Sequence, residues 1–280
     1  MKDKLLVNQI IPFSNVDGDG NRLSIFVQGC NINCIYCHNS ETISHCNHCG
    51  LCVAPCPSGA LSLENGFVKY EKRRCTGCDT CINICPSQST PKAEYYNKDE
   101  LMNIIVEYGA YIRGITVSGG EPTLNYKFLR ELFIDVKKLG LTCYIDTNGY
   151  FDFEEIYSLI EETDGFLFDV KAVENQFTLC GTTSEAPLKN LISLLEMEKI
   201  AEVRTVVLSD FMDSENTVKV VAGLLSGFNG ITYKLMKVHL TGLKRKQKEN
   251  IRKAVPTDIF MTHLKSLAYN KGADIIKIIG

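Results

Sequence analysis

The sequence predicts an α/β protein whose main part is an open, partial (β/α)6 barrel of the TIM type, interrupted by a small cysteine-rich domain. Two observations support this prediction. Strand-like and helix-like runs alternate outside residues 39–91, which is typical of parallel βαβ units. Removing that segment of about 53 residues leaves about 227, fewer than the roughly 250 of a closed eight-stranded barrel. We therefore expect one domain from residues 1–38 and 92–280 and an inserted domain from residues 39–91.

The alternating runs form six strand–helix units and a last strand. The first strand, Leu23–Gln28, ends two residues before the first cysteine, and its helix, Asp99–Tyr108, follows the insert. The other expected strands are 112–118, 142–146, 165–170, 202–208, 233–239 and 274–278, and the other helices are 126–138, 153–162, 187–199, 214–226 and 257–270. Folds of this kind place their active sites on the loops after the strands, so we expect function there.

Five of these strand ends carry polar or glycine-rich segments. They are a cysteine triplet after the first strand, Ser118–Pro122, Asp146–Gly149, Asp169–Lys171 and His239. Taken singly, a glycine pair such as Gly119-Gly120 forms an ordinary turn about as often as it serves a ligand site. Asp146 alone would more often cap a helix than bind an ion, and His239 alone would more often be a buried histidine than a ligand contact. Their recurrence on successive strand ends favours a functional site.

Cysteine is the unusual component of the composition. The chain of 280 residues has 13 cysteines, an odd number that excludes complete intramolecular pairing. The start does not look secretory, and no run approaches the roughly 18 apolar residues of a membrane helix. The net charge of −3 argues against nucleic acid as the main partner. We therefore expect a cytoplasmic monomer without a membrane or nucleic-acid partner, whose cysteines hold metal.

Eight cysteines form an internal repeat in the insert. Cys46-x2-Cys49-x2-Cys52-x3-Cys56-Pro57 recurs 29 positions later as Cys75-x2-Cys78-x2-Cys81-x3-Cys85-Pro86. This is the spacing of a bacterial ferredoxin with two [4Fe–4S] clusters, in which the fourth cysteine of each run binds the other run's cluster. The crossed ligand sets expected here are Cys46, Cys49, Cys52 and Cys85 for one cluster, and Cys75, Cys78, Cys81 and Cys56 for the other.

Two further observations bear on the insert. Asn65-Gly66 lies between two short strand-like runs, 60–63 and 67–70, which predicts a hairpin. Zinc is the alternative metal, because it also binds C-x2-C pairs and could recruit His45 and His48. Zinc ribbons have two cysteine pairs, whereas this insert has two triplets each followed by Cys-Pro, so iron–sulfur clusters are favoured.

The remaining five cysteines divide into a triplet and two isolated residues. Cys30-x3-Cys34-x2-Cys37 supplies only three thiolates, so a [4Fe–4S] cluster bound there would keep one iron open, as catalytic metal sites do. Cys143 lies in an apolar strand and Cys180 precedes a glycine, and we expect both to be packing residues.

The segment Gln28–Asn39, including Tyr36 before the last cysteine, resembles the cluster loop of the radical S-adenosylmethionine (SAM) enzymes. Within that superfamily the chain is similar to the activating enzymes of glycyl radical enzymes. The further matches are Val16-Asp17-Gly18, Cys37-His38-Asn39, Ser118–Glu121 and Asp146–Gly149. With the two-cluster insert and the opening Ile10–Ser14, the chain most resembles the YjjW-type activases.

The resemblance implies three [4Fe–4S] clusters, SAM and a Na⁺ or K⁺ ion. The cluster on Cys30, Cys34 and Cys37 would cleave SAM, with Gly119, Gly120 and Glu121 lining its methionine amino group. The cation would lie on Asp146, Thr147, Asp169 and the carbonyl of Leu167. The other residues implied around the cofactor are Tyr36, Asn39, Lys171, Arg204, Val206 and His239. One departure is Asp19, where the family has a proline in Val-Asp-Gly-Pro-Gly, which makes this loop less rigid.

The expected activity is that of a radical SAM oxidoreductase that activates a glycyl radical enzyme under anaerobic conditions. It would split SAM into methionine and a 5′-deoxyadenosyl radical, which removes an α-hydrogen from a glycine of the partner. Flavodoxin or ferredoxin would donate electrons through the insert. Two alternatives remain: a radical SAM enzyme acting on a small molecule, and a ferredoxin-like electron carrier whose barrel is only a scaffold.

Overall fold

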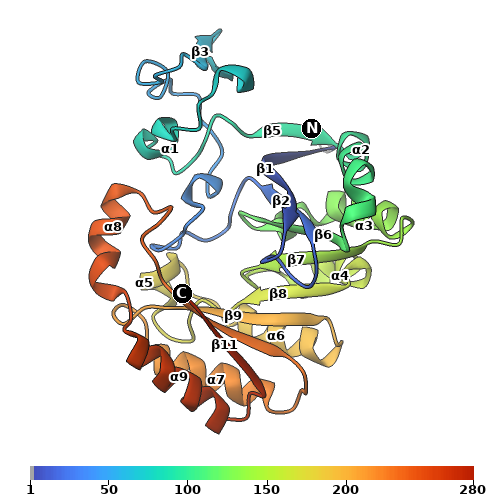
Figure 1. The fold of residues 1–280 in the computed structure, drawn as a ribbon, viewed down its shortest axis with the longest axis vertical. Coiled ribbons are helices and arrows are strands. Elements are labelled where there is room, and N and C mark those ends of the chain that lie inside the picture. The colour runs from blue at the N-terminus through green and yellow to red at the C-terminus, as the bar shows by residue number, and fades with distance from the viewer. Residues whose placement is uncertain (1–2) are drawn as a thin grey trace.

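The computed structural model describes residues 3–280, without the side chains of residues 245 and 246, and its centre is a curved nine-stranded sheet (Figure 1). Neighbouring strands follow the order β11-β10-β9-β8-β7-β6-β2-β1-β5. The strands are β1 (Lys4–Ser14), β2 (Arg22–Val27), β5 (Glu94–Asn97), β6 (Gly114–Gly119), β7 (Thr142–Thr147), β8 (Gly165–Asp169), β9 (Ile200–Val207), β10 (Thr232–Lys237) and β11 (Ile275–Ile279). The seven strands from β2 to β11 in this order are parallel, as expected. In the described residues β11 and β5 do not pair, so the barrel is open.

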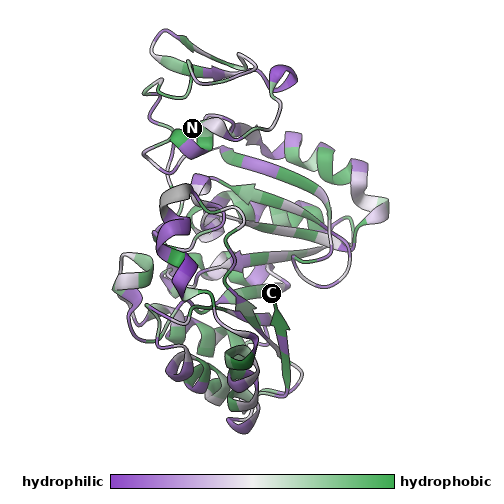
Figure 2. Ribbon diagram, turned by 60° about the vertical axis from the view of Figure 1, so that its left-hand side comes forward, coloured by the Kyte–Doolittle hydropathy of each residue, from purple (hydrophilic) through white to green (hydrophobic). Residues whose placement is uncertain are grey.

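Helices follow the parallel strands and cover the outer face of the sheet (Figure 1). They are α2 (Lys98–Tyr108), α3 (Tyr126–Lys137), α4 (Phe153–Glu162), α6 (Ala186–Glu196), α7 (Ser214–Leu225) and α9 (Asp258–Asn270), all close to the expected ranges. Several begin at a side chain that caps the first turn: Asn97, Asp152, Asp213 and Thr257 each accept a backbone hydrogen bond three residues on. Figure 2 shows hydrophobic residues concentrated in the strands and in these helices. The core between them includes fully buried Leu23, Ile115, Phe133, Phe166 and Leu194.

Two strands were not expected from the sequence. β1 pairs antiparallel with β2 on one side and with β5 on the other. Its register with β2 shifts between Ile11 and Ser14, around Pro12, which lacks the backbone N–H that a regular ladder needs. The short helices α1 (Thr80–Ile84), α5 (Gln176–Cys180) and α8 (Arg245–Ile251) were also not expected.

The insert lies outside the large sheet, beyond its β5 end (Figure 1). It contains the hairpin of β3 (Leu61–Glu64) and β4 (Phe67–Tyr70) and the short helix α1 (Thr80–Ile84). Asn65 and Gly66 both have positive φ, 51° and 80°, so the predicted turn is confirmed. The two ends of the insert meet, because the Ser44 N–H donates to the Gln88 carbonyl over 3.1 Å.

Within residues 3–280, the structure has no helix that combines the length and the apolar character needed to cross a membrane.

Candidate active site

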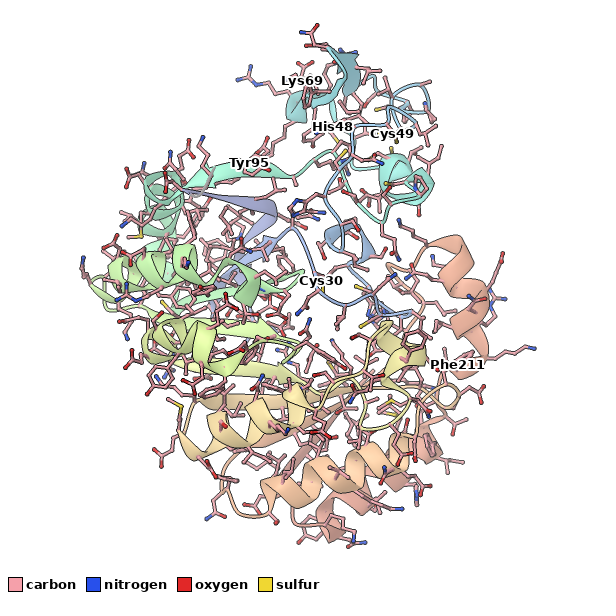
Figure 3. The ribbon with its side chains drawn as sticks, turned by 180° about the vertical axis from the view of Figure 1, so that it is seen from behind. Cys30, His48, Cys49, Lys69, Tyr95 and Phe211 are labelled. Carbon is pink, nitrogen blue, oxygen red and sulfur yellow. The ribbon has the colours of Figure 1, made fainter. Side chains whose placement is uncertain are left out.

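A cavity of about 210 Å³ lies at the carboxyl ends of the parallel strands, where the sequence predicted a site. Cys30 lies centrally in the molecule, between the sheet and the insert (Figure 3). The structure brings most of the expected residues to this cavity, since its lining includes Cys30, Cys34, Tyr36, Cys37, Asn39, Gly119, Gly120, Asp146, Thr147, Asp169, Lys171, Arg204 and Val206. Three expected residues, Glu121, Leu167 and His239, do not line it.

The cysteine triplet lies on a loop that backbone hydrogen bonds hold from both sides. The Cys30 N–H donates to the Ile43 carbonyl over 2.9 Å, which ties the loop to the start of the insert. On the other side, Asn33 and Ile35 donate to the carbonyls of Cys180 and Leu179, at 2.8 and 2.9 Å. This bonding holds the backbone of the loop that carries the three cysteines.

The electrostatics of the loop favour thiols in the absence of a metal. Burial raises the pKa of Cys30 and of Cys37 to about 12. The hydrogen bond to Cys180, together with burial, raises that of Cys34 well above its usual value. In residues 3–280, no three His, Cys, Asp or Glu side chains converge closely enough to hold a single metal ion. Three separated thiols around one cavity suit a polynuclear cluster, whose positive irons stabilise the thiolates.

The two glycines at the end of β6, Gly119 and Gly120, are required by backbone packing. Gly119 has φ of 103°, and a Cβ there would lie 2.6 Å from the Val27 N. A Cβ on Gly120 would overlap the Gly29 carbonyl. The Gly120 and Glu121 N–H groups donate to the carbonyls of Val27 and Gly29, at 2.9 and 2.8 Å. The loop after β6 is therefore packed directly against the loop that carries Cys30.

Glu121 has a different place from the one expected. The side chain is fully buried and does not line the cavity. Its carboxylate accepts from the Thr123 N–H and hydroxyl, from the Thr147 hydroxyl at 2.8 Å and from the Asn148 N–H at 2.9 Å. Burial raises the Glu121 pKa, while these hydrogen bonds act against the shift. Glu121 therefore joins the loop after β6 to the loop after β7, beneath the cavity surface.

Opposite charges alternate from the wall of the cavity into the barrel. Arg204 donates to Asp146 over 3.1 Å and also pairs with Glu202, which in turn pairs with Lys234 at 2.6 Å. Burial raises the pKa of Asp146 to about 6, although Arg204 opposes the shift. Burial lowers the Arg204 pKa less than Asp146 and Glu202 raise it, so the guanidinium stays charged.

Lys171 and Asp169 form a second, partly buried pair at 2.6 Å, so each of the two aspartates expected to hold a cation already has a basic partner. Asp169 nevertheless has one free acceptor: its Oδ1 is buried and has no hydrogen-bond partner in the described residues. The Tyr36 hydroxyl is likewise buried and without a partner there. Buried polar atoms without partners are costly, so these two fit a cavity that is completed by a polar ligand. Leu167, whose carbonyl was expected beside them, lies buried in β8.

His239 lies two residues beyond β10 and is exposed. It is therefore not the buried histidine that the sequence offered as an alternative. Its ring stacks on that of His38 with 3.9 Å between centroids, and its carbonyl lies 2.9 Å from His38 Nε2. His38 lines the cavity, so His239 supports its rim through this neighbour.

Three residues that the structure places at the cluster loop were not expected from the sequence to belong to the site. His38 is one, although it stands inside the motif. Asn148 donates its side-chain amide to Asn31 over 2.8 Å and to Cys30 Sγ over 3.7 Å. Cys180 Sγ lies 3.7 Å from Cys34 Sγ. Asn148 could have been found from its place in the Asp146–Gly149 segment, whereas no local pattern marks Cys180.

The insert cysteines line two cavities. One is lined by Cys46, Cys49, Cys52 and Cys85, and the other by Cys56, Cys75 and Cys78, while Cys81 lines both. Each crossed ligand set is thus brought around one cavity. His48 accepts a hydrogen bond from the Val68 N–H over 3.2 Å, as a loop histidine does.

The loop Val16–Gly20 precedes β2 and therefore lies at the amino ends of the parallel strands, opposite the cavity mouth. The Val16 carbonyl accepts from Arg204 over 3.2 Å, and Asp19 pairs with Arg113 at 3.2 Å. Arg204, which lines the cavity, therefore links this loop to the site.

Comparison with known proteins adds sequence and fold relationships. The model of the Radical SAM superfamily matches residues 24–217. The chain is 34% identical over 261 residues to a Haemophilus influenzae protein described as a glycyl-radical enzyme activating enzyme, covering 85% of this chain and 83% of the relative. It is 31% identical to the choline trimethylamine-lyase activating enzyme of Oleidesulfovibrio alaskensis, covering 77% and 76%.

Two solved structures share the fold. Streptococcus suis SuiB bound to the precursor peptide SuiA matches with a TM-score of 0.57 and 11% identity, over 90% of this chain and 46% of that one. A domain of pyruvate-formate lyase-activating enzyme from Bacteroides vulgatus matches with a TM-score of 0.50 and 20% identity, over 60% of this chain and 99% of that one.

Proposed function

Since the chain belongs to the radical SAM superfamily and to its glycyl-radical enzyme activating enzymes, we propose that Cys30, Cys34 and Cys37 hold the [4Fe–4S] cluster on which its activity depends. When bound, this cluster supplies the electron that splits SAM into methionine and a 5′-deoxyadenosyl radical, which takes an α-hydrogen from a glycine of the partner enzyme. One observation carries the assignment: three thiols line one cavity, and among the residues that the structure describes no fourth cysteine lines it.

The residues of the barrel bind and orient SAM. Gly119 and Gly120 line the cavity where the methionine amino group is proposed to lie. Tyr36 offers a buried hydroxyl that has no hydrogen-bond partner among the described residues. Asn39, Lys171, Arg204 and Val206 line the same cavity and complete the cofactor contacts. Glu121 and His239 act indirectly, through Thr147 and Asn148 and through His38.

A Na⁺ or K⁺ ion is proposed beside Asp146, Thr147, Asp169 and the Leu167 carbonyl. Asp169 Oδ1 supports this site, since it is a buried carboxylate oxygen without a partner in the described residues. Oxygen donors of this type suit hard cations.

The insert is proposed to be a ferredoxin-like domain of residues 39–91 with two further [4Fe–4S] clusters, as in the YjjW-type activases. The two cavities support the crossed ligand sets, because each is lined by one complete set. When bound by these cysteines, the two clusters would supply a path for electrons from a flavodoxin or ferredoxin toward Cys30. The tie between Cys30 and Ile43, three residues before Cys46, supports this route. The enzyme acts on its protein partner as a monomer.

The test uses protein reconstituted with iron and sulfide under anaerobic conditions. Three clusters require about twelve irons per chain, whereas about four would exclude the insert clusters. The reduced protein is mixed with SAM and candidate glycyl radical enzymes, and a glycyl doublet is sought by electron paramagnetic resonance (EPR).

Cys37→Ala is expected to lose SAM cleavage and the doublet, while the matched variant Cys143→Ala keeps both. Deoxyadenosine formed without any partner radical would favour a small-molecule substrate. No SAM cleavage by the reduced wild-type protein would indicate an electron carrier.

A further inference from the structure

Cys180 is a buried thiol in direct contact with the cysteine triplet. It is the last residue of α5, is 1% exposed, and its Sγ lies 3.7 Å from that of Cys34. It does not line the cavity, so it touches Cys34 from behind. Cys143, the other cysteine outside the cluster sets, is buried in β7 near the Phe133 carbonyl. The two isolated cysteines therefore have different surroundings.

The contact between Cys180 and Cys34 is held by the backbone on both sides of Cys34. The carbonyls of Leu179 and Cys180 accept from Ile35 and Asn33, the two neighbours of Cys34. Gly181 ends α5 with φ of 74°, a conformation that L side chains rarely adopt. The sulfur–sulfur contact is thus a fixed part of the loop.

The helix itself is anchored at its other end. Gln176 Oε1 accepts from the Tyr150 hydroxyl at 3.1 Å and from the Ser184 N–H at 2.8 Å. These bonds connect α5 to the loop after β7 and to the segment before α6. Cys180 therefore has little freedom to turn away from Cys34.

The direction of the hydrogen bond follows from the chemistry of the ligand. In the structure the Cys34 thiol donates to Cys180. A cysteine that binds iron is a thiolate and has no proton to donate. Once Cys34 is a ligand, only Cys180 can supply the proton between the two sulfurs.

We propose that Cys180 is a positioning residue whose S–H donates a hydrogen bond to the Cys34 thiolate and raises the reduction potential of the cluster. This inference rests on the proposed function, in which Cys34 is a cluster ligand. Hydrogen bonds to ligand sulfurs withdraw negative charge and so favour the reduced form. Cys180 thereby eases the entry of the electron that SAM cleavage requires.

The test is an EPR-monitored redox titration of the reconstituted full-length protein. The SAM-binding cluster is identified by the change in its EPR signal when SAM is added, because only an open iron can bind SAM. Cys180→Ala removes the donor, Cys180→Ser keeps a donor, and Cys143→Ala is the control.

In Cys180→Ala, the ratio of reduced to oxidised cluster at a fixed potential is expected to fall about tenfold, equal to about 59 mV for a one-electron couple. Cys180→Ser should recover most of this loss, and Cys143→Ala should titrate like the wild type. If Cys180→Ala does not fold, Cys180→Val removes the donor with less loss of volume.

Two results would overturn the inference. If the cluster of the alanine and valine variants is reduced at the same potential as that of the wild type, Cys180 has only a packing role. A loss of about four irons in these variants would make Cys180 a ligand. Failure of the proposed function is a separate result, since the wild-type protein itself would then show no SAM-dependent EPR change.

Discussion

Glu121 connects two loops of the active site from below, and its carboxylate accepts hydrogen bonds from Thr123, Thr147 and Asn148. Glu121→Ala leaves these buried donors without an acceptor, so we expect the free energy of unfolding to fall by about 3 kcal/mol or more. Chemical denaturation measures this change. The exposed Glu131→Ala is the control and should stay within about 0.5 kcal/mol of the wild type. Equal stability of both variants would contradict the bonding role of Glu121.

Asp146 makes stability depend on pH in a predictable direction. Its pKa is about 6 in the folded protein and near 3.8 in the unfolded chain. Between about pH 4 and pH 6 the folded state therefore retains a proton that the unfolded state releases. The free energy of unfolding thus falls as pH rises through this window, by about 3 kcal/mol at most.

The measurement compares wild-type protein with Asp146→Asn, both without SAM, by denaturation across that pH range. In the variant, the free energy of unfolding no longer changes with pH through Asp146. The altered contact with Arg204 changes the free energy of unfolding by the same amount at every pH. A difference in stability that stays constant from about pH 4 to pH 6 would contradict the raised pKa of Asp146.

Among single residues, the sequence predicted the site residues that lie within one local motif. It did not predict the site residues that only the fold brings close to that motif. The three cysteines, Tyr36 and Asn39 stand within ten positions and could be read directly. Cys180 lies 146 positions from Cys34, and no pattern near it indicates the contact. Glu121 was found, but its orientation depends on Thr147 and Asn148 in the next strand's loop.

Among the elements, prediction succeeded where the signals are local and repeated. α4 has the bounds that were predicted, and in the structure Asp152 caps the first turn of this amphipathic helix. β1 was missed, since Lys4–Ser14 mixes polar and apolar residues without strict alternation and contains Pro12. β5 and α5 have four and five residues, too few for a periodic pattern. Their conformations come from tertiary pairing.

Substitution of Gly120 tests how closely the loop after β6 must pack against the loop that carries Gly29. In Gly120→Ala the new methyl group overlaps the Gly29 carbonyl, so one of the two loops must move. We expect a loss of about 2–3 kcal/mol in unfolding free energy and a strongly weakened affinity for SAM, measured by denaturation and by ligand binding.

The control for this variant is Gly227→Ala, where a Cβ meets nothing within 4 Å. It should keep both wild-type stability and wild-type affinity. Unchanged SAM affinity in Gly120→Ala would contradict this prediction, because it would show that the two loops can move apart and the site still binds SAM.

At the scale of the whole molecule, the contact between Ser44 and Gln88 allows the insert to be removed. Residues 45–87 can be replaced by a short glycine linker, because the flanking residues already share a 3.1 Å hydrogen bond. We expect the shortened protein to fold, to bind about four irons and to cleave SAM with a small chemical reductant. With a protein electron donor, its rate should fall well below that of the full-length enzyme.

Iron analysis and SAM cleavage assays with both reductants test this prediction, with the full-length protein as the reference. Equal rates with the protein donor would show that electrons reach Cys30 without the insert. Loss of the remaining cluster would mean that the barrel depends on the insert for its structure.

β2 lies between β1, which precedes it in the chain, and β6, which follows the entire insert. During translation, the ribosome therefore releases β1 and β2 first, then the cysteine-rich segment, and only afterwards β6. The edge of β2 that pairs with β6 is bare throughout this interval, and bare strand edges promote association between chains. The nascent protein is thus most open to chaperone binding while its cysteine-rich segment is already synthesised and the sheet is still incomplete.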